Sequence, residues 1–236
     1  LYPSEYLVRI FASSRNKKLF QFCNYKNKKL LDLSFGDGRN LNFFHSLGFK
    51  VYGTEISKKI IKINALKKKF LMLVGTADNL PFKDNFFQYI VASHSCYYLN
   101  EDCSFNDNLN EISRILNTNG FFICTIPQTS NYYIIGSKTL KANEYLIKND
   151  YLKIRNNYRL FALKTKKKLK KIFNKNFKNI NIGLLENDYF GLKEKMFIVV
   201  CKKKWVLYIV IQLKTLIREE FYRTLIKMDL LYWEDC

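Results

Sequence analysis

Two acids and a set of small residues between them have the spacing of a ligand-binding turn. The run from Leu30 to Asn40 reads Leu-Leu-Asp-Leu-Ser-Phe-Gly-Asp-Gly-Arg-Asn, so that an apolar stretch containing Asp32 leads into Ser34, Gly36 and Gly38. Small residues at alternate positions let backbone N–H groups approach a bound molecule closely. A second apolar stretch ends in Glu55, about 20 residues after the glycines, where an acid commonly holds a ribose. The pair predicts a site for a nucleoside-containing cofactor.

A nicotinamide dinucleotide is the rival ligand for such a turn. Its fingerprint needs a third glycine three residues after the second, which lets the helix pack closely on the strand. That position is Leu41 when counted from Gly36 and Gly38, and Arg39 when counted from Ser34. A turn that binds a pyrophosphate is therefore disfavoured.

The elements that must hold this turn alternate along the chain. Apolar runs predict strands, amphipathic periods predict helices, and alternation of the two is typical of a doubly wound parallel sheet. We expect an α/β, Rossmann-like sheet, mostly parallel with an antiparallel closing strand and with helices on both faces. The predicted strands are 29–35, 51–54, 71–74, 86–93, 121–126, 180–185 and 195–201, and the predicted helices are 3–14, 39–47, 58–69, 105–116 and 164–173.

The chain reads as one principal domain with an extension. Residues 1–204 are predicted to form it, with a lid helix and a basic linker in 1–28 and a cap over the substrate in 128–163, where the regular pattern loosens. Residues 205–236 carry an apolar stripe of helical period and are predicted to form a C-terminal helical extension.

Charge and composition leave several partners open. Forty Lys and Arg against twenty Asp and Glu give a formal charge of +20, which suits an anionic partner but also follows from a lysine- and asparagine-rich composition. The basic residues are spread along the chain, so we expect no nucleic-acid partner. Six scattered cysteines without metal spacing indicate reduced thiols and no metal site, and no apolar run is long enough for a membrane helix. We expect a cytoplasmic monomer or homodimer.

Four motifs in order give the chain a family resemblance. They are Asp32-Leu-Ser-Phe-Gly-Asp-Gly38, then Glu55-Ile-Ser57, then Gly75-Thr-Ala-Asp-Asn-Leu-Pro-Phe82 with Phe87-Gln-Tyr-Ile after it, and finally Leu109-Asn-Glu-Ile-Ser-Arg-Ile-Leu116 with Gly120-Phe-Phe-Ile. In this order the chain resembles the class I S-adenosylmethionine-dependent methyltransferases, of the subgroup that methylates small molecules. The resemblance covers 29–127 closely and extends loosely to residue 201.

The resemblance implies a role for each matching residue. The small residues of the turn would wrap the methionine part of S-adenosylmethionine, Glu55 would accept hydrogen bonds from the ribose hydroxyls, and Ile56 would lie against the adenine. The residues implied to bind the cofactor are Asp32, Ser34, Phe35, Gly36, Gly38, Glu55, Ile56, Thr76, Ala77, Asp78 and Ser93. His94 is the candidate catalytic residue, either as a general base or as a wall of the pocket. The candidate substrate contacts are Tyr2, Arg9, Tyr97 and Tyr132.

Two positions depart from the family's pattern. Ser34 stands where the first glycine is usual, and Thr76 stands where an adenine-binding acid is usual, with Asp78 two places later. Serine is small enough that we expect only a stiffer turn. The second departure leaves the contact to the adenine amine open between Thr76 and Asp78.

Methyl transfer to a small molecule or a sugar, on oxygen, is the predicted function. His94 could remove the proton of a hydroxyl acceptor. The motifs used on exocyclic base amines and on pyrimidine C5 are absent, because Ser93-His-Ser-Cys-Tyr-Tyr98 contains no proline and no cysteine follows a proline. The alternatives are methylation of RNA or another large anionic acceptor, suggested by the charge, and a non-catalytic protein that binds the cofactor and assembles through its C-terminal helix.

Overall fold

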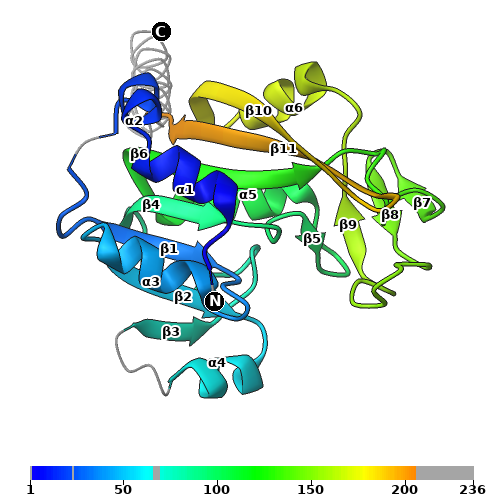
Figure 1. The fold of residues 1–236 in the computed structure, drawn as a ribbon, viewed down its shortest axis with the longest axis horizontal. Coiled ribbons are helices and arrows are strands. Elements are labelled where there is room, and N and C mark those ends of the chain that lie inside the picture. The colour runs from blue at the N-terminus through cyan, green and yellow to red at the C-terminus, as the bar shows by residue number, and fades with distance from the viewer. Residues whose placement is uncertain (1, 23, 66–69, 206–236) are drawn as a thin grey trace, which may run out of the picture. The chain divides into compact units, whose positions relative to one another are not determined.

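A seven-stranded sheet forms the centre of the molecule (Figure 1). The structure is a computed structural model, which describes residues 2–22, 24–65 and 70–205. The strand order is β10-β11-β6-β4-β1-β2-β3, and β11 runs in the direction opposite to the other six strands. The bounds are Lys29–Leu33 for β1, Lys50–Glu55 for β2, Leu71–Val74 for β3, Phe87–Ala92 for β4, Leu116–Pro127 for β6, Phe177–Tyr189 for β10 and Leu192–Lys203 for β11.

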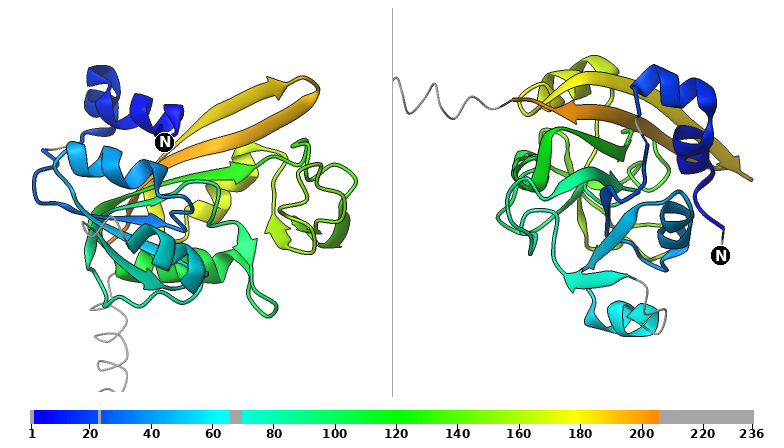
Figure 2. Two further views of the ribbon diagram at one scale, coloured as in Figure 1. Left: turned by 60° about the horizontal axis from the view of Figure 1, so that its bottom comes forward. Right: turned by 90° about the vertical axis from the view of Figure 1, so that its left-hand side faces the viewer.

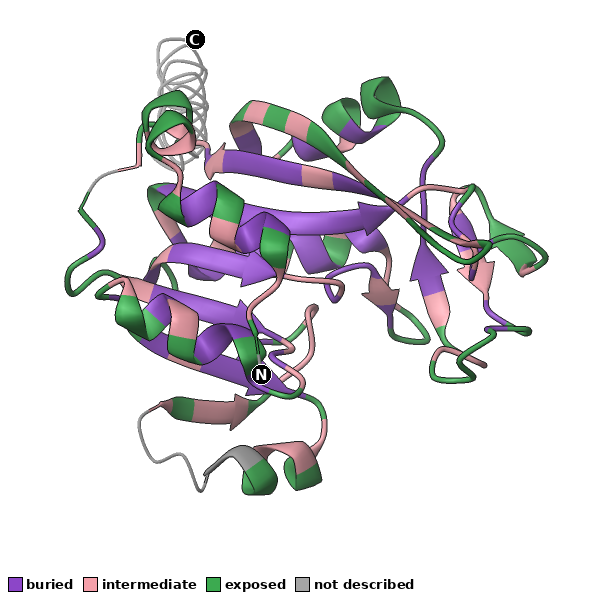
Figure 3. Cartoon of the chain, viewed as in Figure 1, coloured by how far each residue is buried: buried purple, intermediate pink, exposed green. Residues whose placement is uncertain are grey.

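Both faces of this sheet are covered, which explains why its central strands are almost entirely apolar. Successive side chains of β6 point to opposite faces, with Phe121 and Ile123 in one core cluster and Phe122 and Cys124 in the other. Helices α1 (Glu5–Ala12) and α3 (Arg39–Ser46) cover the first face, and α5 (Phe105–Ile115) and α6 (Lys166–Phe173) cover the second (Figure 2). The central strands are buried, whereas the sides of the helices that face away from the sheet are exposed (Figure 3). The predicted fold class is confirmed.

A second, antiparallel sheet was not predicted. Its strand order is β5-β9-β8-β7, with β5 at Tyr98–Leu99, β9 at Arg159–Phe161, β8 at Glu144–Leu146 and β7 at Lys138–Lys141. Most of it lies in the 128–163 segment, which we call the cap. Strands of two to four residues, pairing mainly with one another, show no alternation long enough to recognise in a sequence.

The prediction of a linker over 15–28 was wrong in its first part. Residues Ser14–Phe20 form helix α2, whose first turn is capped by the Ser13 hydroxyl accepting from the backbone N–H of Asn16 at 3.4 Å. Helix α2 buries none of its residues, so it has no apolar face to give a periodic signal. Its polar sequence therefore read as a linker.

The closing hairpin is longer than predicted. Strands β10 and β11 pair without interruption from Asn181–Val200 to Tyr189–Leu192 and turn at Phe190 and Gly191, both with positive φ. Helix α4 (Lys58–Ala65) begins where expected, with the Ser57 hydroxyl accepting from the backbone N–H of Ile60. The predicted continuation of α4 to residue 69 and the predicted extension after Trp205 lie outside the described residues. In the described ranges no helix has the length and apolar character needed to cross a bilayer.

Candidate cofactor and acceptor site

The loop after β1 has the backbone that its small residues allow. Ser34, Gly36 and Gly38 all have positive φ, at 55°, 57° and 75°. A Cβ added to Gly36 would meet no atom within 4 Å, so the positive φ favours glycine here and the space beside it is open. Phe35 packs against Gly53, where a Cβ would lie 2.5 Å from the ring. The loop thus presents backbone to a cavity while Phe35 anchors it to β2.

Glu55 is buried at the end of β2 and supports the same loop. Its Oε1 accepts from the backbone N–H of Gly36 at 3.0 Å, and its Oε2 accepts from that of Ile56 at 2.8 Å. Each carboxylate oxygen has a second lone pair, so the side chain can accept two further hydrogen bonds from a diol. The sequence-predicted acid is therefore held in place by the glycine turn that accompanies it.

The first of two cavities has the residues expected around an adenosine. It has a volume of about 300 Å³ and is lined by Ser34, Glu55, Ile56, Thr76, Ala77, Asp78 and His94, together with residues of 95–100 and the cap residues Ile154 and Tyr158. Asp78 accepts from Asn100 Nδ2 at 2.6 Å and from Cys103 Sγ at 3.1 Å. Burial opposes ionisation, but hydrogen bonds from Cys103, Asn100 and Thr76 hold the pKa of Asp78 below its usual value. Asp78 is thus already engaged by protein donors.

The second cavity is larger and shares two residues with the first. It has a volume of about 500 Å³ and is lined by residues of the β1 loop, α1, the β10–β11 hairpin and the cap; Ser34 and His94 border both cavities. Asp32 lies in its wall at 1% exposure, and its Oδ2 has no hydrogen-bond partner. Burial, then the charges of Asp37 and Glu55, raise the pKa of Asp32 to about 8.

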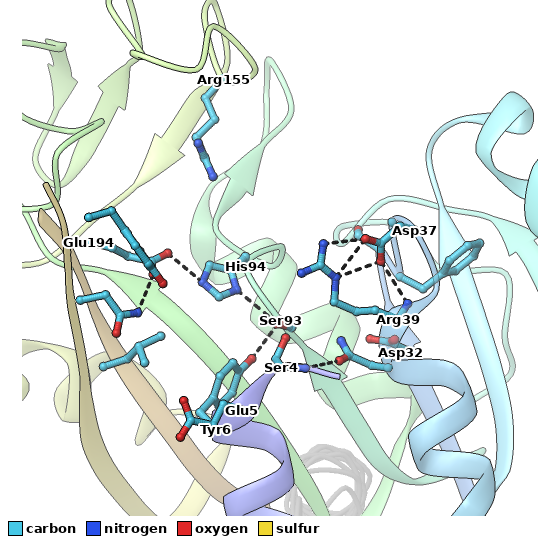
Figure 4. A pocket seen from close by; sticks show the side chains of 17 residues that line it. Ser4, Glu5, Tyr6, Asp32, Asp37, Arg39, Ser93, His94, Arg155 and Glu194 are labelled. Atoms are coloured by element: carbon cyan, nitrogen blue, oxygen red, sulfur yellow. Dashed lines mark hydrogen bonds and ion pairs between the residues drawn. The ribbon is translucent and has the colours of Figure 1, made fainter. Parts of the chain in front are cut away.

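His94 stands where the two cavities meet and is held on both ring nitrogens (Figure 4). Its Nε2 lies 3.2 Å from Glu194 Oε1, and its Nδ1 lies 3.2 Å from the Ser93 hydroxyl. Ser93 in turn accepts from the Tyr6 hydroxyl at 2.7 Å. Burial raises the pKa of Tyr6 far above its ordinary value, which keeps that phenol a hydrogen-bond donor. The arrangement is a chain of four side chains ending on a carboxylate.

Glu194, on β11, was missed by the sequence analysis. A hydrogen bond with His94 is the main cause of the lowered pKa of Glu194, so the carboxylate is ionised at neutral pH. Asn187 Nδ2 donates to its Oε2 at 3.1 Å from the paired strand β10. An ionised acceptor at Nε2 favours the tautomer with the proton on Nε2 and a free lone pair on Nδ1. No motif signals Glu194, because only the antiparallel placement of β11 brings it to His94.

Arg155 was also missed. It belongs to the loop between β8 and β9 and borders the larger cavity. Its side chain is 13% exposed and forms an ion pair with Asp150 at 3.3 Å. The sequence predicts a cap over the site but does not single out any residue of this loop. One arginine among many basic residues forms no motif that would mark it as functional.

The four predicted substrate contacts border neither of the two cavities described above. Tyr2 is 92% exposed, and Arg9 is paired with Glu5 on the outer side of α1. Tyr97 is fully buried, with its hydroxyl 3.2 Å from that of Tyr133. Tyr132 reaches the site indirectly, since its hydroxyl accepts from Arg155 Nη1 at 3.2 Å. The structure therefore gives no contact role to Tyr2, Arg9 or Tyr97.

The residues present fit S-adenosylmethionine. The unpartnered Asp32 Oδ2 suits the cofactor's ammonium group, and the positive-φ loop suits its amino-acid part. Glu55 has acceptor capacity for the ribose hydroxyls, and exposed Ile56 offers an apolar surface to the adenine. With this placement the sulfonium would lie at the junction of the cavities, beside Ser34 and His94.

Comparison with known proteins indicates the same class of domain. Residues 31–124 match the family model described as a methyltransferase domain. An uncharacterised protein of Methanocaldococcus jannaschii is 29% identical over 120 residues, which is 51% of this chain; the chain spans 45% of that relative's length.

Solved structures share the fold at low identity. A Pyrococcus horikoshii protein superposes with a TM-score of 0.55 and 21% identity, covering 86% of this chain and 92% of its own. A Methanosarcina mazei S-adenosylmethionine-dependent methyltransferase gives 0.59 and 14%, covering 79% and 97%. The Burkholderia thailandensis 1,6-didemethyltoxoflavin-N1-methyltransferase, solved with its substrate and S-adenosylhomocysteine, gives 0.55 and 14%, covering 76% and 72%.

The mostly parallel sheet with its antiparallel closing strand is the Rossmann-like methyltransferase fold. Residues 31–124 carry a methyltransferase domain of the class I S-adenosylmethionine-dependent type, and S-adenosylmethionine is the cofactor of that class.

Proposed function

We propose that this protein transfers the methyl group of S-adenosylmethionine to a hydroxyl of a small molecule or sugar, with His94 as general base. The observation that carries the proposal is the place of His94, between the adenosine cavity and the larger cavity and hydrogen-bonded on both ring nitrogens. A group at that junction is close to where a methyl group would be delivered. A pocket wall without a chemical role would not need a half-buried carboxylate behind it.

The side chains around His94 set the direction of proton transfer. The cofactor, when bound, supplies an activated methyl group. Glu194 holds the proton of Nε2, so Nδ1 carries the lone pair that accepts the proton lost by the acceptor hydroxyl. The acceptor hydroxyl takes the place of Ser93 at Nδ1, while Glu194 stabilises the imidazolium that forms. Ser93 remains held by Tyr6.

The walls of the larger cavity favour a small acceptor. The N-terminal helix contributes Tyr6, the cap contributes Arg155, and the hairpin contributes Asn187, Tyr189 and Glu194. The volume of about 500 Å³ must hold the amino-acid part of the cofactor together with the acceptor, which leaves room for a small molecule. We propose that the segment 1–28 and the cap 128–163 enclose the acceptor, with 1–204 as the methyltransferase domain.

Label transfer tests the proposal directly. The full chain is incubated with S-adenosylmethionine labelled in its methyl group and with an unfractionated metabolite extract, and separately with total RNA. We expect label in the small-molecule fraction, and His94→Gln should lower its rate by about 10²-fold or more while leaving the affinity for S-adenosylhomocysteine unchanged. Thr165→Ala, at the N-cap of α6, is the control variant and should keep the rate.

Three results would each contradict a part of the proposal. Label only in RNA would support the large anionic acceptor. Binding of S-adenosylhomocysteine with no transfer to any fraction would support a non-catalytic protein. Full transfer by His94→Gln would leave His94 a wall of the pocket.

A further inference from the structure

Arg155 is presented to the larger cavity by a loop built around Asp150. Asp150 is fully buried, and its Oδ2 accepts from the backbone N–H groups of Ile154 and Arg155 at 3.2 and 3.1 Å. The Asn156 side chain accepts from the backbone N–H of Asp150 at 2.8 Å and closes the loop. These bonds fix the backbone at Arg155, so the direction of its side chain is set by the fold.

The charge of Arg155 is only partly compensated. Its single ion pair is long, at 3.3 Å between Nη1 and Asp150 Oδ2, and that same oxygen also serves two backbone N–H groups. Nη1 also donates to the Tyr132 hydroxyl, and the guanidinium lies over the Tyr133 ring at 4.4 Å. Nε is buried without a partner. A desolvated guanidinium in this state gains most from a planar anion that accepts two parallel hydrogen bonds.

Arg155 stands apart from the part of the cavity that suits the cofactor's amino acid. Figure 4 shows its side chain pointing into the cavity from the cap, on the side of His94 and Glu194, whereas Asp32 belongs to β1 and Asp37 to the loop after it. Tyrosine rings surround its base. An acceptor lying between Arg155 and His94 would have its charged end on the guanidinium and its hydroxyl near the imidazole.

We propose that Arg155 binds a carboxylate of the acceptor, so that the substrate class is a small hydroxy acid. The proposal rests on the proposed function, since it places this carboxylate opposite the hydroxyl that His94 deprotonates. The fork of the guanidinium matches a carboxylate in two hydrogen bonds, whereas a neutral sugar would leave the charge of Arg155 compensated only by the long ion pair with Asp150.

Binding of simple carboxylates to the full chain saturated with S-adenosylhomocysteine tests the proposal. The probes are 4-hydroxybenzoate, 3-hydroxybutyrate and benzoate, and each is compared with its uncharged amide. Binding is measured from the NMR chemical shifts of the two histidine rings. We expect at least one carboxylate to shift His94 and not His45, and its amide to bind about tenfold or more weakly. Arg155→Gln should weaken carboxylate binding by a similar factor. Arg155→Lys should recover only part of the lost affinity.

Controls separate this inference from the proposed function. Arg159→Gln, which removes a cap arginine paired with Glu144 outside both cavities, should leave carboxylate binding unchanged. Calorimetry with S-adenosylhomocysteine reports on the cofactor site and on folding. Failure to bind S-adenosylhomocysteine would contradict the proposed function itself.

Four outcomes would overturn the inference while the cofactor site stands. The first is that no carboxylate shifts the His94 ring, and the second is that acid and amide bind equally. The third is that inorganic phosphate shifts the ring and the carboxylates do not. The fourth is that Arg155→Gln loses affinity for S-adenosylhomocysteine and that carboxylates compete with S-adenosylhomocysteine for the wild-type protein. The last would assign Arg155 to the carboxylate of the cofactor.

Discussion

Cofactor binding should release the proton of Asp32. This carboxyl is buried in the wall of the larger cavity, Oδ2 has no partner, and burial raises its pKa to about 8. At pH 7 a group with that pKa is about nine-tenths protonated. A ligand ammonium group beside it favours the ionised form. Binding of S-adenosylhomocysteine at pH 7 should therefore release about 0.9 proton from Asp32.

Calorimetry in buffers of different ionisation enthalpy measures this proton directly. The slope of binding enthalpy against buffer ionisation enthalpy gives the number of protons released. It should be close to one at pH 7 and fall to about 0.1 at pH 9, where Asp32 is already ionised in the free protein. Asp32→Asn should abolish the slope, whereas Glu144→Gln, a buried acid of the cap, should keep it.

The same measurement can refute the reasoning. A slope of zero in the wild-type protein at pH 7 would show that Asp32 does not change its protonation on binding. An equal slope in Asp32→Asn would assign the proton to another group. In either case the unpartnered Oδ2 would not be the site of the ammonium group.

Three further perturbations follow from the site. Glu55→Ala should weaken the binding of S-adenosylhomocysteine by roughly 1–3 kcal/mol in calorimetry, because it removes a hydrogen-bond acceptor; a change confined to the melting temperature would leave Glu55 only as a support of Gly36. Ser34→Gly should raise the melting temperature or leave it unchanged, since it relieves a positive φ of 55° that costs about 1 kcal/mol or more; a clear fall would mean that the hydroxyl is needed. Because the pKa of Glu194 is lowered on folding, its ionised form stabilises the protein above its unfolded pKa, and this is lost as pH falls through the folded pKa. Glu194→Gln should therefore melt below wild type at pH 7 and close to it in acid; a gap that does not narrow would contradict the hydrogen bond between Glu194 and His94 as the cause of the lowered pKa.

The cofactor half of the site could be predicted because its determinants are local. The apolar runs of β1 and β2, the small residues between Ser34 and Gly38, and the strand-end acid Glu55 lie within one strand–helix–strand unit. The buried pattern of the strands and the positive φ values agree with what the residue types require. The residue types and their spacing are therefore enough to predict this half of the site.

The acceptor half depends on contacts between distant segments. Glu194 reaches His94 only because β11 lies antiparallel beside β6, and Arg155 reaches the cavity only because a short-stranded sheet orders its loop. Neither residue stands in a pattern of its own. Tyr97 and Tyr132 are aromatic residues in the expected region, but the burial of Tyr97 against Tyr133 cannot be deduced from composition.

The pairing of β11 with β6 also decides the sign of the charge beside the imidazole. Met196 pairs with Pro127 and Phe197 with Ile126, and this register places Glu194 toward His94. Its two neighbours in the strand are Lys193 and Lys195. Because side chains alternate across a strand, a slip of one residue would set a lysine against His94 in place of the glutamate. The apolar packing of β11 thus also keeps the Glu194 carboxylate beside the His94 imidazole. A change that loosens the strand would remove this carboxylate from His94 before it unfolds the sheet.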